Sequence, residues 1–182
     1  MANVYLLTGE PGSGKTTLIR QVLSKTKIKA GGFYTDEIRD NSSRQGFKIS
    51  TLDGQESILA HTETSSPFRV SKYGVDIDNL DKVGVSALHQ AIKESDLIVI
   101  DEIGKMELFS PRFKQAVMEA IGSGKKVLGA VMLNPHPFAD EIKHHPGVKL
   151  VQLSRYNNDQ VLREIVTWLE LTIDETETHT SR

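Results

Sequence analysis

A glycine-rich run near the N-terminus has the residue types and spacing that bind a polyphosphate. The run is Gly9-Glu10-Pro11-Gly12-Ser13-Gly14-Lys15-Thr16, which matches the pattern Gly-x₄-Gly-Lys-[Ser/Thr]. Glycines let successive backbone N–H groups turn toward one anion, and the N-terminus of a following helix adds partial positive charge on the same side. We therefore expect the backbone from Gly9 to Thr17 to hold the phosphates of a nucleotide.

Two side chains of this run have more specific expected roles. The Lys15 ammonium would reach the β- and γ-phosphates, and the Thr16 hydroxyl would ligate Mg²⁺. The alternative is a glycine-rich turn whose lysine faces solvent. An apolar strand pattern before the run and a helical pattern after it favour the phosphate site.

A second candidate centre is a pair of carboxylates at the end of an apolar run. Asp101 and Glu102 follow Leu97-Ile98-Val99-Ile100 directly. We expect Asp101 to hold Mg²⁺ through water, and Glu102 to accept a proton from an attacking water or to orient it. The pair could also merely end a strand in solvent or cap the next segment. The phosphate-binding run earlier in the chain favours catalysis, in which water cleaves the γ-phosphate.

Such a reaction needs a further cation, because negative charge spreads over the γ-oxygens in the transition state. Four basic residues are candidates, and each could instead be a solvated surface charge: Arg69, Lys72, Lys105 and Arg112. Lys105 is favoured because it lies close to Asp101 in the chain.

The elements that must position these residues alternate between strands and helices. Apolar runs predict strands at 4–7, 97–100, 127–132 and 148–153, and helical spacing predicts helices at 15–26, 78–94, 111–122, 138–144 and 158–171. Alternation between 31 and 61 predicts an antiparallel hairpin or meander. Together they predict a mostly parallel α/β sheet with helices on both faces and a small antiparallel insertion, and its ligands should lie at the carboxyl ends of the strands.

Length and composition limit the remaining possibilities. The chain has 182 residues, which predicts one domain over 1–172 followed by a polar, frayed tail over 173–182. It has no cysteine, so thiolate metal sites and cysteine nucleophiles are excluded. With 22 basic and 24 acidic residues, no net field favours nucleic acid, and no apolar segment is long enough to span a membrane. We expect a soluble, cytoplasmic protein that acts as a monomer, with an oligomer as the alternative.

Four stretches resemble one family, the small P-loop nucleoside triphosphatases that include the cancer-related nucleoside-triphosphatase and its microbial relatives. They are residues 8–18 (TGEPGSGKTTL), 31–37 (GGFYTDE), 69–76 (RVSKYGVD) and 101–109 (DEIGKMELF). The first is shared by many nucleotide-binding proteins, whereas the others in this order are specific. The resemblance covers residues 3 to about 170 and implies a RecA-like P-loop core that needs Mg²⁺ and hydrolyses ATP, GTP, CTP and UTP with broad base tolerance.

The same resemblance supports Arg69 and Lys105 as cations on the phosphate side. One position departs from the family pattern: this chain has Ser71 where the family usually has glycine, so we expect the turn after Arg69 to differ.

Two other function classes share the phosphate-binding run. A nucleotide or small-molecule kinase would add an acceptor pocket and an arginine-rich lid, but Arg112 is the only arginine between 103 and 150. A regulatory or RNA-associated switch would use slow hydrolysis only to time a conformational state. No base-reading motif is visible, which is a further reason to expect broad base specificity.

Overall fold

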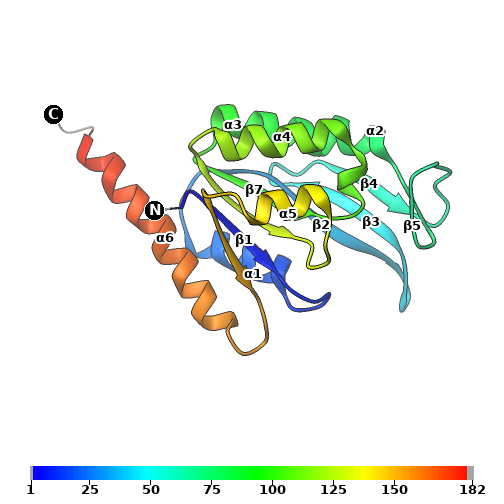
Figure 1. The fold of residues 1–182 in the computed structure, drawn as a ribbon, viewed down its shortest axis with the longest axis horizontal. Coiled ribbons are helices and arrows are strands. Elements are labelled where there is room, and N and C mark those ends of the chain that lie inside the picture. Colours follow the sequence, from blue (N-terminus) through cyan, green and yellow to red (C-terminus); the bar gives the residue numbers. More distant parts are fainter. Residues whose placement is uncertain (1, 180–182) are drawn as a thin grey trace.

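The chain folds around one mixed β-sheet, described here from a computed structural model (Figure 1). The structure describes residues 2–179, and side chains for residues 2–171. The sheet has nine strands in the order β5-β6-β4-β3-β2-β7-β8-β1-β9. Their bounds are β1 Val4–Thr8, β2 Ala30–Asp40, β3 Ser43–Thr51, β4 Glu56–His61, β5 Arg69–Val70, β6 Tyr73–Val75, β7 Leu97–Ile103, β8 Lys126–Val131 and β9 Val148–Gln152.

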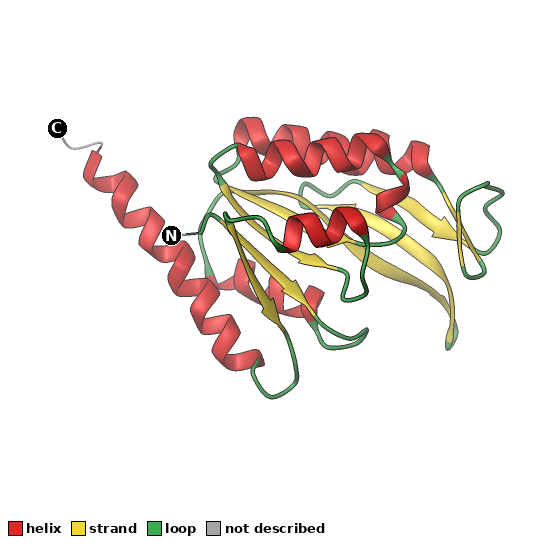
Figure 2. Cartoon of the chain, in the orientation of Figure 1, coloured by secondary structure: helices red, strands yellow, loops and turns green. Residues whose placement is uncertain are grey.

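The strands β7, β8, β1 and β9 form a parallel core, as the sequence predicts. Strand β2, which the sequence assigns to the antiparallel insertion, joins this core by pairing in parallel with β7. Helices cover both faces of this core (Figure 2). One face carries α3 (Ser86–Glu94), α4 (Pro111–Gly122) and α5 (Pro137–Lys143), and the other carries α1 (Lys15–Lys25) and α6 (Asn158–His179). The predicted parallel α/β architecture is therefore confirmed.

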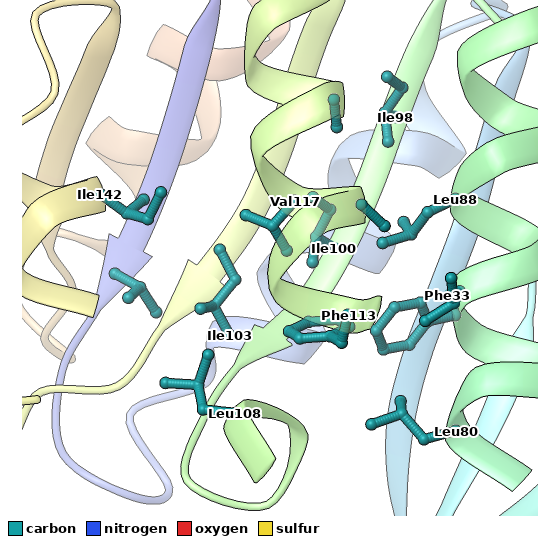
Figure 3. Close-up of a cluster of buried hydrophobic side chains, with 14 of the residues drawn as sticks. Phe33, Leu80, Leu88, Ile98, Ile100, Ile103, Leu108, Phe113, Val117 and Ile142 are labelled. Atoms are coloured by element: carbon teal, nitrogen blue, oxygen red, sulfur yellow. The ribbon is translucent and has the colours of Figure 1, made fainter. Parts of the chain in front are cut away.

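Alternating residues of the central strands divide the core into two layers. Val4 and Leu6 of β1 pack under α3, α4 and α5, whereas Tyr5 and Leu7 pack under α1 and α6. Figure 3 shows the first layer, where Phe33, Ile100 and Phe113 meet beneath the helices. Strands that are buried on both faces read as continuous apolar runs, which is why the sequence located them.

The antiparallel part is larger than the sequence predicts and continues the same sheet. Strand β2 pairs in parallel with β7 through residues 30–33 and then antiparallel with β3 through residues 33–40. Strands β3, β4, β6 and β5 follow in antiparallel pairs. Gly32 permits the junction, because a Cβ on Gly32 would lie 2.0 Å from the carbonyl oxygen of Val99 in β7.

Two helices differ from their predicted bounds. The segment predicted as one α-helix over 78–94 consists of α2 (Ile77–Asn79), a π-helical stretch (Leu80–Val85) and α3. Helix α6 continues past the predicted end at residue 171 to His179, since no glycine or proline follows Leu171 to stop it. Residues 173–179 of the expected frayed tail are thus helical, and 180–182 lie outside the described residues. No described helix is long and apolar enough to cross a membrane.

Candidate active site

The phosphate-binding run forms a tight loop between the end of β1 and the start of α1. Gly12 and Gly14 have φ of 78° and 91°, a region that favours glycine, so the spacing of the motif reflects a backbone requirement. Helix α1 begins at Lys15 immediately after this turn. The Lys15 ammonium donates to the carbonyl oxygens of Gly9 and Glu10 at 2.8 and 3.2 Å. Lys15 therefore lies across the loop and does not extend into solvent.

The carboxylate of Asp101 is buried beside this loop. Asp101 comes directly after the apolar residues of β7, and the residue is only 3% exposed. Burial raises the pKa of Asp101 to about 7, while hydrogen bonding with the Thr16 hydroxyl and the charge of Lys15 act in the opposite direction. These effects show that the fold brings Thr16, Lys15 and Asp101 together, although residues 15 and 101 are far apart in the chain.

Two glutamates share a small space next to Asp101. A Cβ on Gly104 would lie 2.6 Å from Oε1 of Glu102 and 2.9 Å from Oε2 of Glu107, so the two carboxyl groups approach the same point. Burial raises the pKa of Glu102, and the charge of Lys15 lowers it. Burial, reinforced by the charge of Glu102, raises the pKa of Glu107 well above its ordinary value. The sequence predicts no role for Glu107. The one local feature that could have singled it out is that this acidic residue directly precedes an apolar residue, Leu108, which is buried.

Strand β2 supports the end of β7 from the other side. The Thr35 hydroxyl donates to the backbone carbonyl of Asp101 at 2.7 Å. Asp36, whose charge also raises the pKa of Asp101, pairs with Arg20 of α1 at 2.7 Å. The Arg20 guanidinium lies 4.4 Å from the ring centroid of Tyr34. The 31–37 stretch thus joins α1 to the carboxylate strand, a role that sequence alone did not reveal.

Comparison with known proteins agrees with this geometry. A family model described as NTPase matches residues 4–166. The nucleoside-triphosphatase THEP1 of Thermotoga sp. strain RQ2 is 47% identical over 91% of this chain and 94% of the relative. The human cancer-related nucleoside-triphosphatase is 36% identical over 93% and 98%. The crystal structure of THEP1 from Aquifex aeolicus superposes with a TM-score of 0.84 at 35% identity, covering 92% of this chain and 99% of that one.

The chain belongs to this nucleoside-triphosphatase family. It is an NTPase with the P-loop fold, and the recognition made from the four sequence stretches is confirmed.

The donor set of this NTPase fits a hard divalent cation. The Oδ2 atom of Asp101 is buried and has no hydrogen-bond partner in the described part of the chain, and the Thr16 hydroxyl faces the same carboxylate. Among the described side chains, no group of three or more acidic, histidine or cysteine residues could hold a metal. Mg²⁺ is commonly held by one or two protein oxygens together with waters and substrate phosphates, so two such oxygens, on Thr16 and Asp101, fit the protein's share of a magnesium site.

The two expected transition-state cations are placed differently. Lys105 is exposed in the turn after β7, three residues beyond Glu102 in the chain, and its side chain has no hydrogen bond or ion pair within the described residues. Arg69 lies in the edge strand β5 and donates to the carbonyl of Lys72 at 2.9 Å. The structure does not bring Arg69 into contact with the phosphate loop. Its neighbour Phe68 instead packs against Phe109, 5.3 Å between ring centroids.

The turn after Arg69 keeps a glycine-like backbone despite its serine. Ser71 has φ of 53°, in the left-handed region. It occupies the first position of the two-residue connection between β5 and β6, where hairpin turns of the glycine-favouring type require positive φ. The sequence predicts that this turn differs because glycine is replaced by serine. The backbone of Ser71 nevertheless stays in the left-handed region that glycine would favour.

Proposed function

We propose that this NTPase requires Mg²⁺ and hydrolyses ATP, GTP, CTP and UTP to the nucleoside diphosphate and phosphate with little preference for the base. The observation that carries the proposal is the meeting of Thr16, Lys15 and the buried carboxylate of Asp101 at the phosphate loop. Thr16 and Asp101 would hold the metal ion, which when bound neutralises charge on the phosphate oxygens.

Each residue of the cluster has a distinct proposed task. Lys15 and the backbone N–H groups of residues 9–17 orient the phosphates. Glu102 takes a proton from water as the water oxygen bonds to the γ-phosphorus, and the bond from that phosphorus to the β–γ bridging oxygen breaks. The proton then passes to the released phosphate. Burial suits Glu102 to this task, because a general base works best when its pKa approaches the operating pH.

Lys105 is our proposed source of positive charge for the γ-oxygens. Two observations support this role: Lys105 follows Glu102 by three residues in the chain, and its side chain is exposed and has no ion pair within the described residues. Arg69 has weaker support, because its guanidinium is bonded within its own hairpin.

Broad base tolerance is supported by how the phosphate loop is built. Its proposed contacts are backbone N–H groups and one ammonium, and these meet phosphates that all four substrates share.

The decisive experiment measures phosphate release and nucleotide binding with and without Mg²⁺ for the wild type, Lys15→Ala and Glu102→Gln. We expect Lys15→Ala to lose binding. Glu102→Gln should bind normally but hydrolyse about 10²- to 10⁴-fold more slowly, which is the usual contribution of a general base. Normal hydrolysis by Glu102→Gln would show that another group activates water.

The same experiment separates the rival functions. Transfer of the γ-phosphate to a nucleoside or nucleotide, with little release to water, would favour a kinase. Tight nucleotide binding with negligible turnover would favour a regulatory switch. Similar kcat/KM values for the four substrates would support broad specificity, and a preference of about a thousandfold would contradict it.

A further inference from the structure

The loop that joins β9 to α6 lies directly against the phosphate loop. The Leu153 amide donates to the carbonyl of Thr8 at 2.7 Å. A Cβ on Gly9 would lie 2.7 Å from the Leu153 carbonyl oxygen, and one on Gly14 would lie 3.7 Å from Nδ2 of Asn158. Residues 154–157 therefore stand beside the phosphate loop.

The order of the strands indicates which end of a nucleotide reaches this loop. In the sheet, β1 lies between β8 and β9, and β7 lies beyond β8. The carboxylates of Asp101 and Glu102 are on the β7 side, so the γ-phosphate of a bound nucleotide faces that side. The opposite end, which carries the ribose and the base, then leaves the phosphate loop on the β9 side, toward residues 154–157.

The loop formed by residues 154–157 carries an exposed aromatic side chain, Tyr156. Tyr156 is 83% exposed, more than any other large apolar or aromatic residue that the structure describes as exposed. The Arg155 guanidinium lies 4.8 Å from its ring centroid, and Nη2 of Arg155 donates to the Tyr156 hydroxyl at 2.6 Å. The remainder of the ring is free to meet a flat partner.

The backbone that carries Tyr156 is held by several hydrogen bonds. Oδ1 of Asn157 accepts from the Ser154 amide at 2.8 Å, and Nδ2 of Asn157 donates to the Gln152 carbonyl at 2.9 Å. The Tyr156 amide donates to Oγ of Ser154 at 3.2 Å. A backbone held in this way loses little conformational freedom when a ligand binds, and the hydrogen bond from Arg155 to the Tyr156 hydroxyl restrains the ring.

We propose that Tyr156 is the stacking surface for the nucleobase, with Arg155 as a positioning residue that holds the ring. This inference rests on the proposed function, because it names the residue that contacts the base of the nucleotide substrate. Stacking on an aromatic ring tolerates every base, because each base has a π-face. A stacking contact in place of base-edge hydrogen bonds would account for the broad base specificity proposed above.

The test compares nucleoside diphosphates with a ligand that has no base. Calorimetric titration with ADP, GDP, CDP and UDP, and with pyrophosphate as the base-free probe, is done in Mg²⁺ on the wild type, Tyr156→Ala and Tyr156→Phe. We expect Tyr156→Ala to weaken all four diphosphates by about 5- to 100-fold, the range typical of one stacked base, and to leave pyrophosphate binding unchanged. Tyr156→Phe should bind like the wild type.

Two results would overturn the inference. One is unchanged diphosphate affinity in Tyr156→Ala. The other is an equal loss of pyrophosphate binding, which would mean that the substitution damages the phosphate loop. In turnover assays we expect Tyr156→Ala to raise KM with little change in kcat, because stacking on the base is the same in the ground and transition states.

A spectroscopic variant separates this inference from the proposed hydrolysis. The chain has one tryptophan, Trp168, so Tyr156→Trp adds a single new reporter. We expect ADP and UDP to quench the added fluorescence and pyrophosphate to leave it unchanged. Quenching by the diphosphates in an enzyme that does not release phosphate would support the stacking site while refuting hydrolysis. Equal quenching by pyrophosphate would refute the stacking site itself.

Discussion

Asp101 is a single residue whose burial lowers the stability of the folded protein above neutral pH, which fits its proposed role as a metal ligand. The folded chain holds its carboxyl group 3% exposed, and burial raises its pKa from 3.8 to about 7. Because the folded state binds this proton more tightly than the unfolded state, the free energy of unfolding falls as pH rises from about 4 to about 7. Above that range the folded protein carries a buried charge that a cation would compensate.

We therefore predict that Asp101→Asn is more stable than the wild type by a few kcal/mol at pH 8 in EDTA, because the amide carries no charge. At pH 5, where Asp101 of the folded wild type is protonated, the gain should shrink. Urea unfolding at both pH values measures the difference. A gain that does not grow with pH would show that Asp101 titrates near its ordinary pKa.

Ser71 is a second residue at which the backbone determines the effect of a substitution. Its φ of 53° costs a non-glycine residue roughly 1–2 kcal/mol, and glycine loses about 0.5–1 kcal/mol through its more flexible unfolded state. We predict that Ser71→Gly raises the free energy of unfolding by about 0.5–1 kcal/mol. Asn41, with φ of 54°, is the matched control, since asparagine tolerates this region. If Ser71→Gly and Asn41→Gly raised the free energy of unfolding equally, this account would be contradicted.

At the scale of elements, β2 connects the two halves of the sheet. Its first residues pair with β7 and its later residues with β3, so its position also fixes Thr35 against the carbonyl of Asp101. The close approach at Gly32 is the point where this arrangement is most sensitive to side-chain volume.

We predict that Gly32→Ala destabilises the protein by about 3 kcal/mol or more, because its methyl group would overlap the Val99 carbonyl and its φ of 113° disfavours alanine. Gly54→Ala is the control. Gly54 also has positive φ, 96°, but a Cβ there meets nothing within 4 Å, so only the backbone cost of about 1–2 kcal/mol remains. Urea unfolding of both variants should separate them, and equal losses would mean that steric overlap with β7 has no effect.

The elements also show which features sequence could reveal. The phosphate loop and Asp101 lie in contiguous patterns, a glycine spacing and an apolar run, so local reasoning located them. Glu107, Thr35 and Tyr156 have no such local signature. Their roles depend on strands and loops that meet only in the folded sheet, and the parallel pairing of β2 with β7 joins residues about 67 positions apart.

At the scale of the whole molecule, we propose that residues 1–172 act as one domain. The sheet is continuous from β5 to β9, and both apolar layers pack against it. Since the phosphate loop is contributed by β1 and α1 and the carboxylates by β7, a ligand that binds both links the central strands. Binding should therefore stabilise the molecule as a unit.

We predict that ADP with Mg²⁺ at about 100 times its Kd stabilises the protein by about 2.7 kcal/mol, which for a chain of this size raises Tm by roughly 5–10 °C. Chelation of the metal should remove most of this rise. Lys15→Ala should show almost none, whereas Lys93→Ala, an exposed lysine on α3, should keep it. GDP should give a rise similar to that of ADP. If Lys15→Ala were stabilised as much as the wild type, the diphosphate would be binding somewhere other than the phosphate loop.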